Sequence, residues 1–425
     1  MQIFINPTQS EWPSIIQRPT MDLGLIFEKV RPIMDEVKRN GDAALRRYAL
    51  QFDGVELDLL EVTEVEKIAA QQWVSEELKA AINQAAKNIK TFHEKQLTPV
   101  EIIETMPGVK CWRKSVGIDK VGLYIPGGTA PLFSTLLMLA IPAKLAGCKE
   151  IVVCTPPQKD GAVHPAVLYA ASITGVTKII KAGGAQAIAA MAYGTHTVPQ
   201  VYKIFGPGNQ FVTAAKQLVQ LDGIAIDMPA GPSEVCVLAD VSCNPAFVAA
   251  DLLSQAEHGA DSQVLLVSSL FSVVNRVEEE IAKQLAVLPR MEFAAKALEN
   301  SRAIVMENLD AAIELVNAYA AEHLIICCEN DEAIADQISN AGSIFLGNYS
   351  PESVGDYASG TNHTLPTNGY ARMYSGVSVD SFVKKITVQK LTETGLRNIA
   401  PTVVVMAMAE GLHAHAEAVR VRMDN

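Results

Sequence analysis

The sequence has no cluster of basic residues and no pairing pattern among its cysteines. Its 35 lysine and arginine residues are outnumbered by 47 aspartate and glutamate residues, which gives a net charge of -12. Because nucleic-acid binding requires a concentrated basic surface, no nucleic-acid partner is expected. The seven cysteines show no CxxC spacing. We therefore expect all of them to be reduced core residues in a cytoplasmic protein.

The chain also lacks signals for secretion or membrane insertion. Residues 1–7 contain no basic region followed by an apolar one, so no signal peptide is expected. Residues 121–143 carry no charge over a length that could span a bilayer. That stretch is interrupted by Pro126, Pro131 and Pro142, which is typical of a strand, a tight loop and a buried helix. A membrane partner is therefore not expected.

Length and hydrophobic patterning predict an α/β protein with two units. The chain has 425 residues, which is too long for one ordinary core, and 49% of them are hydrophobic. Residues 23–98 show helical spacing. Residues 120–346 then alternate between short apolar strands and helices, and residues after Lys384 are expected to be mostly helical. Such alternation predicts parallel sheets covered by helices on both faces.

Three glycine-rich turns follow predicted strands. They are Tyr124-Ile-Pro-Gly-Gly, Gly183-Gly-Ala-Gln186 and Phe205-Gly-Pro-Gly-Asn209. The first alone is explained equally well by a tight turn or by an anion site at a helix start, and the third alone is only weak support for a nucleotide site. Phe211 stands where a dinucleotide fingerprint has its third glycine, so that motif is absent. Turns at successive strand ends nevertheless share one sheet edge, and ligands bind at that edge.

A second group of motifs supplies metal-type ligands and proton-transfer groups. Gln255 and His258 are three residues apart on a predicted helix and share one face. Further donors lie in three later motifs, which are Glu322-His323, Gly355-Asp356-Tyr-Ala-Ser-Gly-Thr-Asn-His363 and Glu410-Gly-Leu-His-Ala-His415. Nitrogen and oxygen donors of this kind suit a zinc-type ion and acid–base chemistry. Taken singly, each motif is also typical of a polar helix end, a salt bridge, a polar loop or a solvated helix.

Together, the motifs resemble those of the histidinol dehydrogenase family. The resemblance covers residues 20–420 in the family's order. It rests on Tyr124-Ile-Pro-Gly-Gly, Gly183-Gly-Ala-Gln, Gly206-Pro-Gly-Asn, Pro229-Ala-Gly-Pro-Ser-Glu, Gln255-Ala-Glu-His, Ala321-Glu-His-Leu, Gly355-Asp-Tyr-Ala-Ser-Gly-Thr-Asn-His and Glu410-Gly-Leu-His-Ala-His. It implies a zinc-dependent oxidoreductase that converts L-histidinol to L-histidine through bound L-histidinal. Two molecules of NAD would be used, in the last step of histidine biosynthesis.

The resemblance also implies an architecture of two Rossmann-like parallel-sheet domains, one inserted in the other, with small helical terminal segments. Residues 1–19 would form an N-terminal segment. Residues 20–124 and 234–378 would form the first α/β domain, and residues 125–233 would form the inserted domain with the NAD-binding turns. Residues 379–425 would form a helical C-terminal segment exchanged between the subunits of a homodimer with shared active sites.

The family's functional residues carry over to matching positions of this sequence. One zinc ion per subunit would be bound by Gln255, His258, Asp356 and His415. NAD would contact Tyr124, Gln186 and Asn209. The remaining substrate contacts would be Ser233, Glu322, His323, His363 and Glu410, and the zinc ligands would contact substrate as well. Glu410 and His415 would reach the active site of the other subunit.

The implied mechanism gives the catalytic work to Glu322 and His323. His323 would remove the alcohol proton as the first hydride leaves for NAD, since an imidazole titrates near working pH. Glu322 would then activate water to hydrate the aldehyde. His323 would help to deprotonate the hydrate as the second hydride leaves.

Four other functions compete with this interpretation. The first is a related zinc and NAD dehydrogenase acting on another small polyol or amino alcohol. The second is a zinc hydrolase in which Glu322 activates water, which predicts turnover without NAD. The third is a zinc-binding protein without catalytic activity. The fourth, an aldehyde dehydrogenase with a cysteine nucleophile, is disfavoured because no cysteine lies in a site-forming loop.

Overall fold

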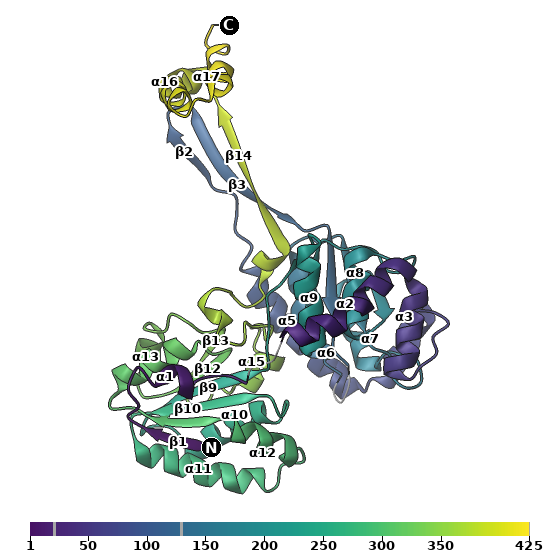
Figure 1. Cartoon of the computed structure of the whole chain (residues 1–425), viewed down its shortest axis with the longest axis vertical. Helices are drawn as coiled ribbons and strands as arrows, with labels where there is room; N and C mark the ends of the chain where they lie inside the picture. Colours follow the sequence, from purple (N-terminus) through teal and green to yellow (C-terminus); the bar gives the residue numbers. More distant parts are fainter. Residues whose placement is uncertain (20–22, 128–130, 425) are drawn as a thin grey trace. The chain divides into compact units, whose positions relative to one another are not determined.

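The computed structural model describes residues 1–19, 23–127 and 131–424, and the chain forms two compact units (Figure 1). The larger unit contains residues 1–96 and 118–382, and the smaller contains residues 97–117 and 383–425. Gly128 of the first glycine turn and the expected boundary at residue 20 lie outside the described residues. No helix within the described residues is long and apolar enough to cross a membrane.

The first sheet of the larger unit has five parallel strands in the order β6-β5-β4-β7-β8. Its strands are β4 (Lys120–Tyr124), β5 (Glu150–Thr155), β6 (Lys178–Lys181), β7 (Lys203–Phe205) and β8 (Ala225–Ile226). The chain adds β5 and β6 on one side of β4 and then crosses to add β7 and β8 on the other. The point between β4 and β7 is therefore a topological switch point, where doubly wound sheets bind ligands.

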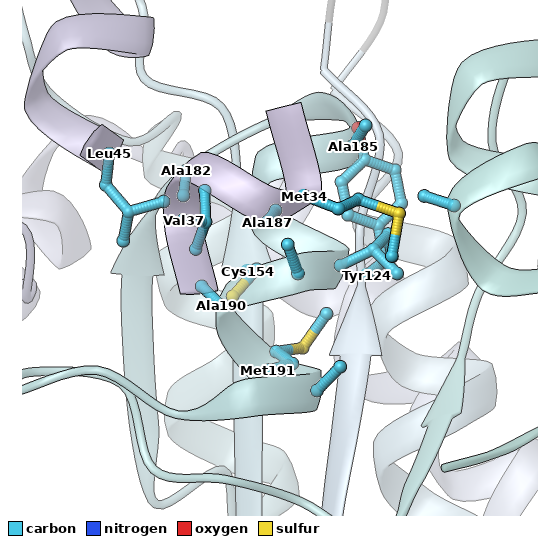
Figure 2. Close-up of a cluster of buried hydrophobic side chains, with 14 of the residues drawn as sticks. Met34, Val37, Leu45, Tyr124, Cys154, Ala182, Ala185, Ala187, Ala190 and Met191 are labelled. Carbon is cyan, nitrogen blue, oxygen red and sulfur yellow. The ribbon is translucent and has the colours of Figure 1, made fainter. Parts of the chain in front are cut away.

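Helices cover both faces of this sheet, and each face has its own hydrophobic core. The first layer contains α2 (Leu23–Asn40), α3 (Asp42–Tyr48), the π-helical turn η1 (Ala49–Asp53), α8 (Gly184–Tyr193) and α9 (Gln210–Leu221). The second contains α4 (Glu64–Trp73), α5 (Glu76–Glu94), α6 (Phe133–Leu145) and α7 (Pro165–Thr174). Figure 2 shows side chains of the first core, among them Met34 and Val37 from α2 and Ala187 and Met191 from α8.

The second sheet of the larger unit has six parallel strands in the order β1-β11-β10-β9-β12-β13. Its strands are β1 (Gln2–Ile5), β9 (Glu234–Ala239), β10 (Gln263–Ser268), β11 (Arg302–Val305), β12 (His323–Cys327) and β13 (Ser343–Leu346). Strands β9, β10 and β12 are buried along their whole length, as expected of central strands in a parallel sheet. The five-stranded sheet lies between β1 and β9 in sequence.

Two hydrophobic cores also flank the six-stranded sheet. One is formed with α10 (Pro245–Ala256), α11 (Phe271–Leu285) and α12 (Met291–Glu299). The other is formed with α1 (Trp12–Ile15), α13 (Leu309–Tyr319) and α14 (Asp331–Ala335). Shorter elements follow, which are α15 (Glu352–Tyr357) and the 3-10 turns η2 (Tyr370–Arg372) and η3 (Val379–Phe382).

The expected domain boundaries differ from this packing in two respects. Helices α2 to α5 pack against α6 to α9 of the five-stranded sheet, whereas residues 20–124 were expected to join residues 234–378. Residues 2–5 form an edge strand of the six-stranded sheet, although residues 1–19 were expected to form a separate segment. Helical periodicity identifies the apolar face of a helix, but it does not identify the sheet that covers that face.

The smaller unit contains a three-stranded antiparallel sheet in the order β14-β3-β2, followed by two helices. Its elements are β2 (Ile102–Met106), β3 (Val109–Gly117), β14 (Val383–Leu391), α16 (Glu393–Ala409) and α17 (His413–Arg420). The expectation of a mostly helical chain after Lys384 is therefore wrong for β14. That strand pairs with β3, which is remote in sequence, so local patterning does not reveal the pairing.

Candidate active site

A cavity of about 1000 Å³ lies at the carboxyl edge of the five-stranded sheet. Its lining includes residues that follow β4, β5, β6 and β7, among them Tyr124, Pro156, Gly183, Gln186 and Asn209. The three glycine-rich turns therefore border one cavity, as the sequence predicts. The cavity also lies at the switch point of the sheet, where a ligand site is expected on general grounds.

Tyr124 and the second glycine turn are joined by a hydrogen bond. The Gly184 N–H donates to the Tyr124 hydroxyl oxygen at 3.0 Å. Burial raises the pKa of Tyr124 to about 12, so the hydroxyl is neutral at physiological pH. Because its oxygen accepts the bond from Gly184, its own proton can donate to a ligand. Gln186 lies two residues further on, in the first turn of α8, and is almost fully buried.

The third glycine turn is fixed by close packing and a buried ion pair. Gly206 has a φ of 124°, and a Cβ atom there would lie 2.1 Å from the Tyr124 carbonyl oxygen, so only glycine fits. Lys216 and Asp227 form an ion pair beneath the turn. Lys216 Nζ also donates to the Gly206 carbonyl oxygen at 2.8 Å, and Asp227 accepts from the Gly206 N–H at 2.8 Å.

Asn209 has a structural function at this turn as well as a place on the cavity wall. Its side-chain oxygen accepts from the N–H groups of Phe211 and Val212 at 3.0 and 3.2 Å, which caps the start of α9. Since the cap uses the oxygen, a ligand in the cavity would meet the amide nitrogen.

A second polar site lies at the amino end of the six-stranded sheet. His323 is the first residue of β12, and Glu322 precedes it. Ser233 precedes the neighbouring strand β9, to which β12 is paired in parallel. This edge is opposite to the carboxyl edge at which doubly wound sheets usually bind ligands.

His323 is surrounded by acceptors. Its Nε2 lies 3.2 Å from Asp356 Oδ1, and its Nδ1 lies 3.3 Å from the Glu234 carbonyl oxygen and 3.7 Å from Glu322 Oε2. Burial by itself would lower the pKa of His323, but the neighbouring carboxylates of Glu322, Glu352 and Asp356 raise it.

Burial acts on the pKa of Glu322 in the opposite direction. Its carboxylate accepts the Glu234 N–H at 3.0 Å and is almost fully buried. Burial raises the pKa of Glu322 to about 8. A carboxyl group that titrates near working pH is suited to general acid–base catalysis.

Asp356 interacts electrostatically with three histidines. Burial opposes its ionisation, but the hydrogen bond from His323 and attraction to His363 and His258 lower its pKa. The His363 Nδ1–H donates to the Asp356 carbonyl oxygen at 2.8 Å, which leaves His363 Nε2 to accept from the Thr135 hydroxyl at 2.9 Å. Burial lowers the pKa of His363, and partial desolvation lowers that of His258, so both favour the neutral form.

The expected zinc ligands are brought together only in part. Gln255 is completely buried in the last turn of α10, and neither side-chain atom has a hydrogen-bond partner. His258 lies just beyond the end of that helix, and Asp356 lies on α15. His415 lies on α17 of the smaller unit. Among the described residues, no group of three or more His, Cys, Asp or Glu side chains is arranged to hold a metal ion.

Comparison with known proteins places this arrangement in a family. The histidinol dehydrogenase family model matches residues 16–423. The chain belongs to the histidinol dehydrogenase family. A histidinol dehydrogenase from Bacteroides thetaiotaomicron is 58% identical over 424 residues, covering 100% of this chain and 99% of that protein. A chloroplastic histidinol dehydrogenase from Arabidopsis thaliana is 54% identical over 419 residues, covering 98% and 90% respectively.

The fold agrees with this family assignment. The crystal structure of histidinol dehydrogenase from Elizabethkingia anophelis has a TM-score of 0.97 and 54% sequence identity. The match covers 100% of this chain and 98% of that chain. The α/β architecture expected from the sequence is confirmed, and the chain is an enzyme of the histidinol dehydrogenase type.

Within the histidinol dehydrogenase framework, the described structure gathers most of the expected residues into two sites. Tyr124, Gln186 and Asn209 line the cavity. Glu322, His323, Asp356 and His363 lie in the polar site, with Ser233 at the same sheet edge. Glu410 and His415 are exposed in the smaller unit, beside the junction of α16 and α17.

A role for Glu352 was not predicted from the sequence. It is 1% exposed, and its Oε1 atom accepts from the Ser254 hydroxyl at 3.2 Å, while Oε2 is buried without a partner. Burial raises the pKa of Glu352 to about 8, and its charge acts on His323. Its spacing four residues before Asp356 was the available signal, because residues four apart on a helix share a face.

Proposed function

We propose that this enzyme oxidises L-histidinol to L-histidine through bound L-histidinal, with two molecules of NAD and one zinc ion per subunit. The observation that carries this proposal is the buried pair Glu322 and His323, held against Asp356, in a chain of the histidinol dehydrogenase family. The proposed reaction would be the last step of histidine biosynthesis. A related dehydrogenase of another small polyol or amino alcohol is the alternative.

The cavity of the five-stranded sheet has the chemistry required for NAD. Helices α7, α8 and α9 all begin at residues on its wall, since His164 and Asn209 cap two of them and Gly184 starts the third. Helix N-termini present free N–H groups and positive dipole ends to phosphate groups. Lys29 and Lys159 add positive charge to the same wall. When bound, NAD accepts the hydride in each oxidation.

The residues of the polar site also fit zinc in the proposed ligand set. The buried, unpaired amide of Gln255 needs a polar partner, and a metal ion would provide one. The neutral form of His258 and the ionised form of Asp356 are those that ligate metals. We propose that His415 of a second copy completes the set. When bound, zinc would hold the nitrogen atoms of the substrate and orient it.

In the first oxidation, His323 acts as the general base. Its Nδ1 can keep its proton, donated to the Glu234 carbonyl oxygen. The surrounding carboxylates raise the pKa of His323, and its Nε2 lies 3.2 Å from Asp356, so the imidazole favours its protonated form while Asp356 is its partner. With Asp356 engaged as a zinc ligand, Nε2 would be free to take the substrate's hydroxyl proton. As that proton leaves oxygen, the carbon–hydrogen bond breaks with loss of hydride, and the alcohol becomes the aldehyde. Burial of the site keeps this reactive amino aldehyde away from bulk water.

In the second oxidation, Glu322 acts first. Its carboxylate takes a proton from water as the water oxygen bonds to the aldehyde carbon, and His323 returns the proton of the first oxidation to the aldehyde oxygen, which forms the hydrate. His323 then removes a hydroxyl proton from the hydrate as the second hydride leaves, and the resulting carboxylic acid ionises to the carboxylate. The pKa of Glu322, raised to about 8 by burial, makes its carboxylate a stronger base than an ordinary one.

Substrate identity is tested by a panel of amino alcohols and polyols. Ser233, His363 and Glu410 are the proposed contacts to groups specific to histidinol. We expect kcat/KM for L-histidinol to exceed that of every other compound, and we expect no turnover when NAD is omitted. Preference for another alcohol would favour the alternative dehydrogenase, and turnover without NAD would favour a hydrolase.

The smaller unit supports the proposal of a homodimer. Helix α16 buries only Gly395, Ala400 and Ala407, while Val405 and Met406 are 69% and 60% exposed. An amphipathic or apolar surface left open in this way is typical of a subunit interface. We propose that this face is covered by a second copy and that Glu410 and His415 complete the partner's site.

Truncation of the chain tests this assembly. Deleting residues 400–425 should convert the dimer to a monomer and abolish zinc binding, as measured by light scattering and metal analysis. The point variant Met406→Glu should weaken the dimer by placing a charge on the apolar face, whereas Glu393→Gln, at the exposed start of the same helix, should not. A truncated monomer with full zinc content and activity would refute the proposal.

A further inference from the structure

The turn η1 places one carboxylate on the wall of the cavity. Asp53 is the last residue of this π-helical turn, and Gly54 ends the turn with a φ of 72°. Its Oδ2 atom is buried and has no hydrogen-bond partner. A single-turn π-helix is unusual and often marks a functional position. A residue that lines the cavity therefore carries an acceptor atom that the protein's own groups leave unsatisfied.

The lining of the cavity carries both signs of charge. It includes Lys29, Lys159 and the N-termini of three helices, which suit an anionic ligand, together with the carboxylates of Asp53 and Asp160. A carboxylate would repel phosphate groups, and as an acceptor it suits a ligand's hydroxyl groups. Burial raises the pKa of Asp53 to about 6, so it is still mainly ionised at neutral pH. An anionic ligand with hydroxyl donors satisfies both features of the wall.

The position of Asp53 in the fold suits the adenosine end of a bound dinucleotide, which does not react. It follows α3, in the helix layer that contains α2 and α8. The polar site contacts the second helix layer, where His363 is hydrogen-bonded to Thr135 of α6. The reactive end of a dinucleotide must approach the polar site, so Asp53 meets the adenosine end.

We propose that Asp53 is a specificity-determining residue that accepts a hydrogen bond from the 2′-hydroxyl of the adenosine ribose and excludes a 2′-phosphate. This assignment rests on the proposed function, because it requires NAD in this cavity. A carboxylate beside the 2′ position would favour NAD over NADP through the lost hydrogen bond and the repulsion between like charges.

Binding of nucleotide fragments tests the assignment without using catalysis. ADP-ribose, 2′-deoxy-ADP-ribose, NAD and NADP would be titrated calorimetrically into the full-length wild type and Asp53→Asn. The wild type should bind ADP-ribose about 10- to 100-fold more tightly than the deoxy compound, as expected for a hydrogen bond to a charged group. Asp53→Asn should lose most of that difference and should gain affinity for NADP relative to NAD.

Asp160 provides a matched control. It lines the same cavity, but it is exposed, and its carboxylate already accepts the Ala162 N–H at 3.0 Å. Asp160→Asn should therefore leave both affinity ratios unchanged. If it shifts them as much as Asp53→Asn does, general electrostatics explains the effect and the assignment to Asp53 is overturned.

The outcomes separate this assignment from the proposed function. If the wild type binds NAD and ADP-ribose but does not distinguish the deoxy compound, the assignment of Asp53 is wrong and the cofactor site stands. If the wild type binds neither NAD nor ADP-ribose, the proposed cofactor site fails together with the assignment. The wild-type comparison of the two ADP-ribose compounds decides the matter even if Asp53→Asn does not fold.

Discussion

Replacing Glu322 with glutamine should spare the first oxidation and cripple the second. In the proposed mechanism the carboxylate is needed only to activate water, and glutamine has the same shape without a basic oxygen. The rate of L-histidinal oxidation should fall about 10²- to 10⁴-fold, the usual contribution of a general base. The rate of L-histidinal formation from L-histidinol should change little. Single-turnover measurements of the two half-reactions would separate these effects.

His323→Asn is the matched comparison, because His323 accepts a proton in both oxidations. That variant should slow both half-reactions, whereas Glu322→Gln should slow one. Loss of both half-reactions to the same extent in Glu322→Gln would contradict the division of labour between the two side chains. The Glu234 N–H, which donates to Glu322 at 3.0 Å, can also be accepted by the glutamine oxygen, so the fold should be retained.

Replacing His258 with alanine should remove zinc and activity together. His258 favours the neutral, ligating form, and in the proposed set it is one of four ligands. Removing a residue that is hydrogen-bonded to a metal ligand lowers metal affinity about 10- to 100-fold. Removing a ligand itself should lower zinc affinity by at least as much. Zinc content after dialysis at defined free zinc, measured together with kcat, would test this expectation.

His363→Asn provides the control for His258→Ala. The resemblance to the family assigns His363 to the substrate and not to the zinc ion, and in this structure its ring nitrogens are paired with Asp356 and Thr135. The variant should keep its zinc and raise KM for L-histidinol. If His363→Asn loses zinc while His258→Ala retains it, the proposed ligand set is wrong.

The parts of the fold that were predictable depend on local sequence. Fully buried strands such as Glu234–Ala239 are continuous apolar runs, and each glycine turn marks the end of a strand. Because parallel strands end at one edge, three turns far apart in the sequence could be expected at one cavity. The histidinol dehydrogenase motifs added the residues of the polar site.

What the sequence did not reveal depends on long-range packing. The pairing of β14 with β3 joins segments from opposite halves of the chain, and α2 shows only that one of its faces is apolar. Asp53 and Glu352 are ordinary acidic residues in the sequence. Their significance arises only from burial without a partner, which is a property of the folded chain.

The proposed reaction is a four-electron oxidation that depends on zinc and NAD. The most direct test measures NADH formed per L-histidinol consumed, in enzyme supplied with zinc, treated with a chelator and then resupplied with zinc. The proposed function predicts about two NADH per substrate, lost on chelation and restored by zinc. One NADH per substrate would mean that the reaction stops at the carbonyl, and turnover that is unaffected by chelation would contradict the role of zinc.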